Sequence, residues 1–171
     1  FANIERSLRI YRQRFPRKYW NHMPAEAVLN NVGSGIWQDY FKFTVERNPW
    51  DKAVSAYHYQ FKDESKDKEQ IRDFETFIHS GSGYNWNYDL YSIQGVPQMD
   101  YIVRYENLQE ELNEVSQYLQ FPENVYDVMK NIHAKSKYRP DRNYRDWYTP
   151  TSRRIIGLQA AREIALLGYE F

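Results

Sequence analysis

An arginine and a serine eight positions apart, Arg47 and Ser55, form the pair best suited to chemistry in this sequence. Arg47 closes an alternating stretch typical of a strand, and Asn48-Pro49 follows at once as a helix N-cap and first-turn pair. Such a strand places the guanidinium at the carboxyl edge of a sheet, where open α/β folds bind ligands. The helix start is expected to add backbone N–H donors suited to an anion.

The position of Ser55 on that helix predicts a hydroxyl outside the core. With about 3.6 residues per turn, Ser55 lies more than about 100° from the apolar stripe of the helix, which consists of Trp50, Val54, Tyr57 and Phe61. Its hydroxyl is therefore predicted to join Arg47 on one phosphate group. The alternative is an ordinary ion pair at Arg47 and a surface serine at Ser55.

Strands that alternate with helices must position these residues. The segment Tyr40 to Arg47 alternates apolar and polar side chains as a strand does, and Tyr101 to Tyr105 predicts a second strand. Helices are predicted over 7–15, 71–79 and 125–133, and from Pro24, Asn48, Asn107 and Thr149 onward, the last with Ile155, Leu158, Ile164 and Leu167 toward the core. The segment 85–97 reads as an irregular loop or hairpin. This order predicts an α/β domain with a parallel sheet between helices.

Composition predicts one folded domain over residues 1–171. Hydrophobic residues make up 42% and charged residues 27%, and 23 Lys and Arg balance 23 Asp and Glu, so no net charge draws the protein to nucleic acid. The chain has no cysteine, and its four histidines do not have metal-site spacing. Neither a signal peptide nor about 18 consecutive apolar residues is present, which favours a cytoplasmic protein without a membrane span.

The Arg47 segment resembles a known family. Arg-Asn-Pro at 47–49 followed by Ser-Ala-Tyr-His at 55–58 is similar to the segment that binds the 3'-phosphate in sulfotransferases that use 3'-phosphoadenosine 5'-phosphosulfate (PAPS), especially the carbohydrate branch. Upstream, YWNHMPAEAVLNNVG resembles the segment that carries the catalytic base of these enzymes, which implies His22 in that role. Downstream, the resemblance of HAKSKYRPDRNYRDWYTP implies a loop over the nucleotide with Ser136 and Arg139 as ligands.

The resemblance implies a P-loop-NTPase-like, three-layer sulfotransferase fold that moves a sulfuryl group from PAPS to a carbohydrate or glycoconjugate hydroxyl, without a metal. Such enzymes hold the 5'-phosphosulfate on a strand and a Lys-containing glycine-rich loop, and neither Gly33 nor Gly81 has that context. The first strand and this loop are therefore expected before Phe1. Glu46 stands where the family commonly has an apolar residue, and it would put a carboxylate beside the phosphate unless it points to the opposite face of the strand. Arg104 and Glu106 are expected to form a structural ion pair.

Two other functions stay open on the sequence alone. One is another nucleotide-dependent transferase with a P-loop-like fold, because a phosphate-binding arginine at a strand end is not unique to PAPS enzymes. The other is a carbohydrate-binding module without catalysis, in which the aromatic segment from Tyr84 to Tyr91 would be the stacking surface. The acceptor and the oligomeric state do not follow from the sequence.

Overall fold

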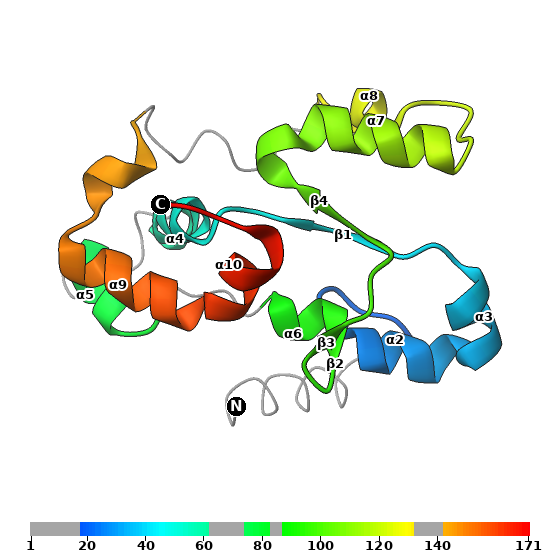
Figure 1. Cartoon of the computed structure of the whole chain (residues 1–171), viewed down its shortest axis with the longest axis horizontal. Helices are drawn as coiled ribbons and strands as arrows, with labels where there is room; N and C mark the ends of the chain where they lie inside the picture. Colours follow the sequence, from blue (N-terminus) through cyan, green and yellow to red (C-terminus); the bar gives the residue numbers. More distant parts are fainter. Residues whose placement is uncertain (1–17, 62–73, 83–86, 132–141) are drawn as a thin grey trace.

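The structure is a computed structural model that describes residues 18–61, 74–82, 87–131 and 142–171. Two strands, β1 (Phe43–Glu46) and β4 (Tyr101–Arg104), pair in parallel, with Phe43 opposite Tyr101 and Glu46 opposite Arg104. Helices surround them, so the chain is a mixed α/β protein, mostly helical, with a small parallel sheet (Figure 1). The two strands that the sequence predicts are confirmed, although the first is four residues long and does not reach Tyr40.

One face of the sheet is covered by α7 (Leu108–Tyr118). The helix follows a short 3₁₀ turn, η1 (Tyr105–Asn107), and its Leu112 and Val115 bury against Val103 of β4. The helix predicted from Asn107 is thus confirmed. The next helix, α8 (Val125–Met129), lies beside α7, and its first backbone N–H donates to the Ser116 hydroxyl oxygen at 3.0 Å. It is shorter than the predicted 125–133, of which residues 132 and 133 lie outside the described chain.

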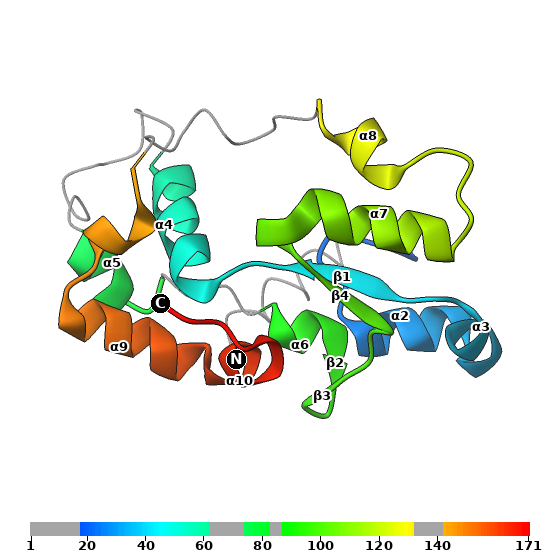
Figure 2. The same cartoon turned by 45° about the horizontal axis from the view of Figure 1, so that its top comes forward.

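The elements on the other side of the strands are α2 (Ala25–Val32), α3 (Ser34–Asp39), α6 (Tyr88–Tyr91) and a hairpin of β2 (Ser92–Ile93) and β3 (Val96–Pro97), and both views show them opposite α7 (Figures 1 and 2). The predicted helix from Pro24 is confirmed. The sequence missed α3, because Gly33 and Gly35 read as a break although Gly33, at φ 83°, only turns the chain between two helices.

A second core lies where α4 (Pro49–Gln60), α5 (Phe74–His79) and α9 (Pro150–Gln159) meet. Trp50 and Val54 of α4 are buried there with Phe77 and Ile156, and Tyr57 and Phe61 pack against them, which confirms the predicted stripe. The final helix begins at a Thr149 capping box as predicted, but breaks at Ala160 into α9 and α10 (Ala161–Leu167).

Leu158 is the exception to the predicted core of this last segment, since its side chain is 68% exposed. At Gly157 a Cβ would lie 3.4 Å from the Trp50 ring, so α9 turns its glycine toward α4 at this level. Leu158, one residue on, consequently faces outward. No helix within the described residues has the length and apolar character needed to cross a membrane.

Candidate functional site

The turn between β1 and α4 is fixed by Asn48, which is almost completely buried. Its side-chain oxygen accepts the N–H groups of Trp50 and Asp51, and its side-chain nitrogen donates to the Glu170 carbonyl at 2.9 Å. Its backbone N–H donates to the Glu106 carboxylate at 2.7 Å. One residue therefore joins the strand end, the helix start, the end of β4 and the C-terminal segment.

This geometry corrects one expectation about the helix start. The N–H groups of Trp50 and Asp51 already donate to the Asn48 side chain, that of Lys52 donates to the Asn48 carbonyl, and Pro49 has none. The first turn of α4 thus has no backbone donor left for an anion. Binding at this place must rest on side chains.

Arg47 supplies the first of these side chains. Its Nε and Nη2 both lie 2.5 Å from Oδ2 of Asp51, and its guanidinium carbon lies 4.5 Å from the centre of the Tyr105 ring. The guanidinium is thus held at one edge by a carboxylate and on one face by an aromatic ring. A guanidinium has five N–H donors, so this arrangement leaves several of them for a ligand.

Lys52 supplies the second side chain, and it is buried with Glu46. The Lys52 Nζ lies 2.8 Å from Oε1 of Glu46, and the same carboxylate accepts the backbone N–H of Arg47 at 3.0 Å. Glu46 is 1% exposed. Its carboxylate therefore points away from the solvent side of Arg47 and compensates Lys52 instead.

Arg47, Lys52 and Ser55 line one pocket of about 410 Å³, together with Ala56, Tyr59, Gln60 and Ser82. Ser55 is half-buried, and its hydroxyl forms no hydrogen bond with the residues that the structure describes. The predicted pair of Arg47 and Ser55 thus faces a common space. Lys52 is not among the residues predicted from the sequence, although its spacing of three residues from Ser55 puts the two side chains on one helix face.

Glu106 holds the turn at Asn48 and does not pair with Arg104 as the sequence predicts. Its carboxylate accepts the Asn48 N–H and the Tyr169 hydroxyl, the latter at 3.4 Å. Arg104 forms no ion pair with Glu106, and its backbone N–H donates to Glu111 at 2.6 Å. The expected Arg104–Glu106 pair is therefore wrong, because Glu106 follows the end of β4 and faces the turn at Asn48.

Two tyrosines, the buried Tyr91 and the half-buried Tyr169, lie near the carboxylates of this region. Burial raises the pKa of Tyr169, and the negative charges of Glu106 and Glu46 raise it further. Burial also raises the pKa of Tyr91, with additional contributions from Glu46 and Glu163. Both phenols therefore stay protonated over the physiological pH range, and neither can serve as a base.

His22 lies away from the lining of the Arg47 pocket, in the exposed turn before α2. Its φ of 57° is in the left-handed region, where histidine occurs more often than most residues other than glycine. The exposed ring is open to solvent at this turn. His58 is a different case, since its ring packs edge-on against Trp147 at 4.8 Å inside the second core.

Ser136 and Arg139, the two predicted ligands of the nucleotide loop, lie outside the described residues. Within the described ranges, no group of His, Asp and Glu side chains is arranged to hold a metal ion. The aromatic segment that begins at Tyr84 is described only from residue 87 onward, where Tyr88 and Tyr91 are buried and contact each other. These two rings are core residues and not a stacking surface.

Comparison with known proteins gives one clear relationship. No family model matches the chain, and no solved structure matches it. An uncharacterized protein of Archaeoglobus fulgidus is 34% identical over 125 residues, which cover 68% of this chain and 98% of that protein. The chain therefore belongs to the same family as this archaeal protein.

Proposed function

We propose that the protein is a sulfotransferase that moves a sulfuryl group from PAPS to a hydroxyl of a carbohydrate or glycoconjugate. The observation that carries this proposal is the common pocket of Arg47, Lys52 and Ser55 at the end of β1 and along α4. The proposed sulfotransferase fold is supported by the parallel pair of strands, by the Arg47 strand that turns directly into α4, and by the order of these elements.

The pocket has the side chains that a 3'-phosphate requires. Two cations and a hydroxyl surround one space, and a phosphate monoester carries close to two negative charges and has three acceptor oxygens. Each charge-assisted hydrogen bond contributes about 1.5 to 3 kcal/mol. Binding energy from this remote phosphate would hold the sulfate of PAPS in place for attack.

Asp51 and Tyr105 set the direction of the arginine. Asp51 takes the Nε and Nη2 edge of the guanidinium, and the Tyr105 ring covers one face. A phosphate that enters the pocket would meet an arginine already restricted in its rotamers, which lowers the entropy cost of binding. Asp51 also repels the phosphate, which offsets part of the attraction by Arg47.

The chemical step is an in-line displacement at sulfur. The acceptor oxygen forms the new O–S bond while the bond from sulfur to the bridging phosphate oxygen breaks, and 3'-phosphoadenosine 5'-phosphate leaves with that electron pair. The hydroxyl proton passes to His22, because the imidazole nitrogen of a histidine can accept a proton as a general base. The exposed turn of His22 leaves its ring accessible to an acceptor.

The test is turnover of PAPS with a panel of soluble carbohydrates. We expect 3'-phosphoadenosine 5'-phosphate and a sulfated sugar to form together, in equal amounts, in the absence of added metal. Arg47→Ala should raise the KM for PAPS by about 10- to 100-fold, which corresponds to the loss of one charge-assisted contact. If PAPS is not consumed while ATP with magnesium is, the protein is instead a phosphoryl-transferring relative.

The role of His22 is tested with a variant that preserves the backbone. Asparagine also tolerates a positive φ, so His22→Asn removes the imidazole with little strain at this turn. If His22 is the base, the His22→Asn variant should have a kcat about 10² to 10⁴ times lower than the native protein, with unchanged affinity for the nucleotide. If the His22→Asn variant keeps kcat within a few-fold, the base lies elsewhere in the protein.

A further inference from the structure

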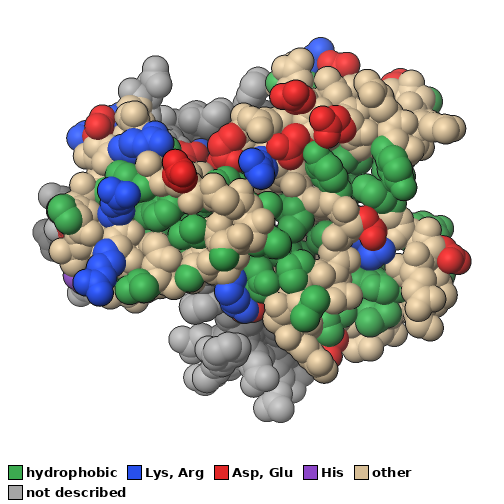
Figure 3. All heavy atoms as spheres, viewed as in Figure 1, with side chains coloured by type: hydrophobic (Ala, Val, Ile, Leu, Met, Phe, Trp, Pro, Cys, Tyr) green, Lys and Arg blue, Asp and Glu red, His purple; other side chains and the backbone are tan. Residues whose placement is uncertain are grey.

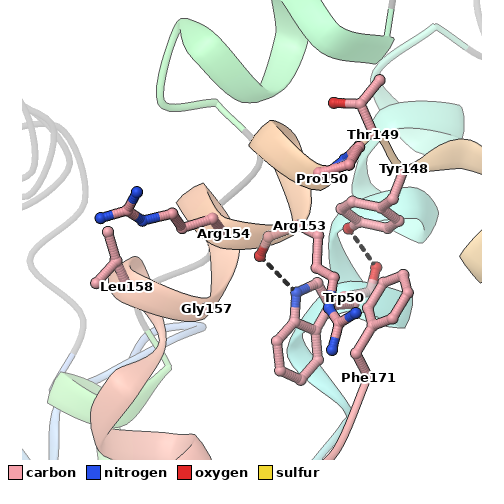
Figure 4. Close-up of a pocket in the computed structure, with 9 residues that line it drawn as sticks. All are labelled: Trp50, Tyr148, Thr149, Pro150, Arg153, Arg154, Gly157, Leu158 and Phe171. Atoms are coloured by element: carbon pink, nitrogen blue, oxygen red, sulfur yellow. Dashed lines mark hydrogen bonds between the residues drawn. The ribbon is translucent and has the colours of Figure 1, made fainter.

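A second groove lies on the opposite side of α4 from Arg47 and Ser55. It has a volume of about 570 Å³, in the range of small-molecule sites. Its walls come from the start of α4, from α9 and from the C-terminal segment (Figure 4), and consist of Trp50, Tyr148, Thr149, Pro150, Arg153, Arg154, Gly157, Leu158 and Phe171. None of these residues lines the Arg47 pocket. Trp50 lies about 140° to 180° around α4 from Ser55 and Tyr59, so the two spaces are on different helix faces.

Three aromatic rings build one side of this groove. Phe171 contacts Trp50 and Tyr148 edge-on, with ring centres 5.6 and 5.4 Å apart. The polar atoms of these rings are already bonded: Trp50 Nε1 donates to the Arg153 carbonyl at 2.9 Å, and the Tyr148 hydroxyl donates to the Trp50 carbonyl at 2.8 Å (Figure 4). The rings are therefore fixed in place, and Tyr148 and Phe171, which are half-buried, offer apolar surface to a ligand, whereas Trp50 is buried.

Two arginines of α9, Arg153 and Arg154, line this groove, and their side chains extend in different directions from the helix (Figure 4). The Arg153 guanidinium lies 4.3 Å from the centre of the Phe171 ring, and Arg154 follows on the exposed side of α9 beside Leu158 (Figure 4). Neither forms an ion pair with a carboxylate among the residues that the structure describes. By contrast, Arg162 on α10 stacks on Tyr88 at the same 4.3 Å but is paired with Asp89 at 3.0 Å.

The surface around the groove is also rich in positive charge. The chain has no net charge, but Lys and Arg side chains gather over α9 while Asp and Glu gather over α7 (Figure 3). A groove with apolar rings and uncompensated guanidinium groups is complementary to a ligand that combines a ring with an anion. Inorganic anions alone would leave the aromatic side unused.

We propose that this groove binds an organic anion in which a flat ring carries a sulfonate, sulfate or carboxylate group. The ring lies against Tyr148 and Phe171, and the anionic group meets Arg153, with Arg154 further along the groove. This site is separate from the Arg47 pocket and does not depend on the function proposed for it. It would recognise a sulfated or acidic small molecule whether or not the protein transfers sulfate.

The test is calorimetric titration of three probes into the whole chain. Naphthalene sulfonate has both the ring and the charge, naphthalene methanol has the ring alone, and inorganic sulfate has the charge alone. We expect naphthalene sulfonate to bind at least about tenfold more tightly than either of the others, because only it uses both parts of the groove. Equal binding of naphthalene methanol, or no binding of naphthalene sulfonate, would overturn the proposal.

Matched variants locate the probe. Arg153→Gln should weaken naphthalene sulfonate about tenfold, and Arg154→Gln should weaken it less. Leu158→Glu should also weaken it, because it places a carboxylate at the exposed rim. Arg162→Gln removes the same charge and a similar ring contact elsewhere, and Arg47→Ala alters the other pocket, so both should leave the affinity unchanged. An equal loss of affinity in Arg162→Gln would show a non-specific charge effect. A loss of affinity in Arg47→Ala would place the probe in the other pocket. Either result refutes the proposal that the probe binds in this groove.

Discussion

Replacing Lys52 with methionine would leave the Glu46 carboxylate buried without its counter-charge. The Nζ–Oε1 distance is 2.8 Å and Glu46 is 1% exposed, so Lys52 is the direct counter-charge of a buried carboxylate. Removal of one partner from such a pair costs about 3 to 5 kcal/mol of unfolding free energy. We expect the lower end, about 3 kcal/mol, because the Arg47 N–H still donates to the same carboxylate.

Replacing the other partner, Glu46, should cost less unfolding free energy than replacing Lys52. Lys52 lines the Arg47 pocket, so in Glu46→Gln its ammonium can reach solvent along the flexible stem. We expect about 1 to 2 kcal/mol for Glu46→Gln, and a double variant Glu46→Gln/Lys52→Met that is more stable than Lys52→Met alone, because it has no buried charge.

Urea unfolding followed by circular dichroism measures all three free energies. Lys130→Met is the matched control, because Lys130 pairs with Asp127 at 2.9 Å on the surface, where the two side chains are 49% and 62% exposed, and its loss should not change stability measurably. The reasoning is refuted if Lys52→Met costs less than Glu46→Gln, or no more than the Lys130→Met control.

Two further changes probe the supports of the site. Asn48→Ala removes the N-cap of α4 and the hydrogen bond to the Glu170 carbonyl, and should lower the unfolding free energy by about 1 to 2 kcal/mol in urea melts. Asn48→Asp retains the cap but loses the donor to Glu170, so its stability should lie between those of the native protein and Asn48→Ala. Equal stability of the native protein and both variants would contradict this role of Asn48. Burial alone would raise the pKa of Glu75, but hydrogen bonds from Ser152 and Thr149 lower it below its usual value. Its contribution to stability is therefore present above the ordinary glutamate pKa of about 4.3 and is lost as the pH falls through the lowered value. Glu75→Gln should make acid unfolding less steep in that range, and an unchanged pH profile would show that these bonds do not favour the charged form.

Local patterns in the sequence were enough to predict β1 and α4, the two elements that carry the site. The Asn48-Pro49 pair and the stripe of Trp50 and Val54 predict α4, and alternation predicts β1, because these patterns depend on neighbours in the chain. The alternation failed at the strand end, where Val45 is 37% exposed and Glu46 is buried. That inversion depends on Lys52 and on tertiary contacts that strand periodicity does not encode.

The sequence predicts part of the candidate site, namely Arg47 and Ser55, but not the contacts that support it. Arg47 and Ser55 were identified because their spacing is local to one strand–helix turn, and they do line one pocket. The sequence did not reveal that Asn48 uses the helix N–H groups itself, or that Glu106 faces Asn48 and not Arg104. Glu106 and Asn48 are 58 residues apart, so only the pairing of β1 with β4 brings them together.

The most direct measurement is the affinity of the protein for 3'-phosphoadenosine 5'-phosphate and for adenosine 5'-phosphate, which differ only in the 3'-phosphate. Calorimetry should give at least about tenfold tighter binding of the first, which corresponds to one charge-assisted contact of about 1.5 kcal/mol or more. In Arg47→Ala that preference should disappear while the affinity for adenosine 5'-phosphate stays the same. Equal affinity of the native protein for both nucleotides, or an undiminished preference in Arg47→Ala, would contradict the assignment of Arg47 to the 3'-phosphate.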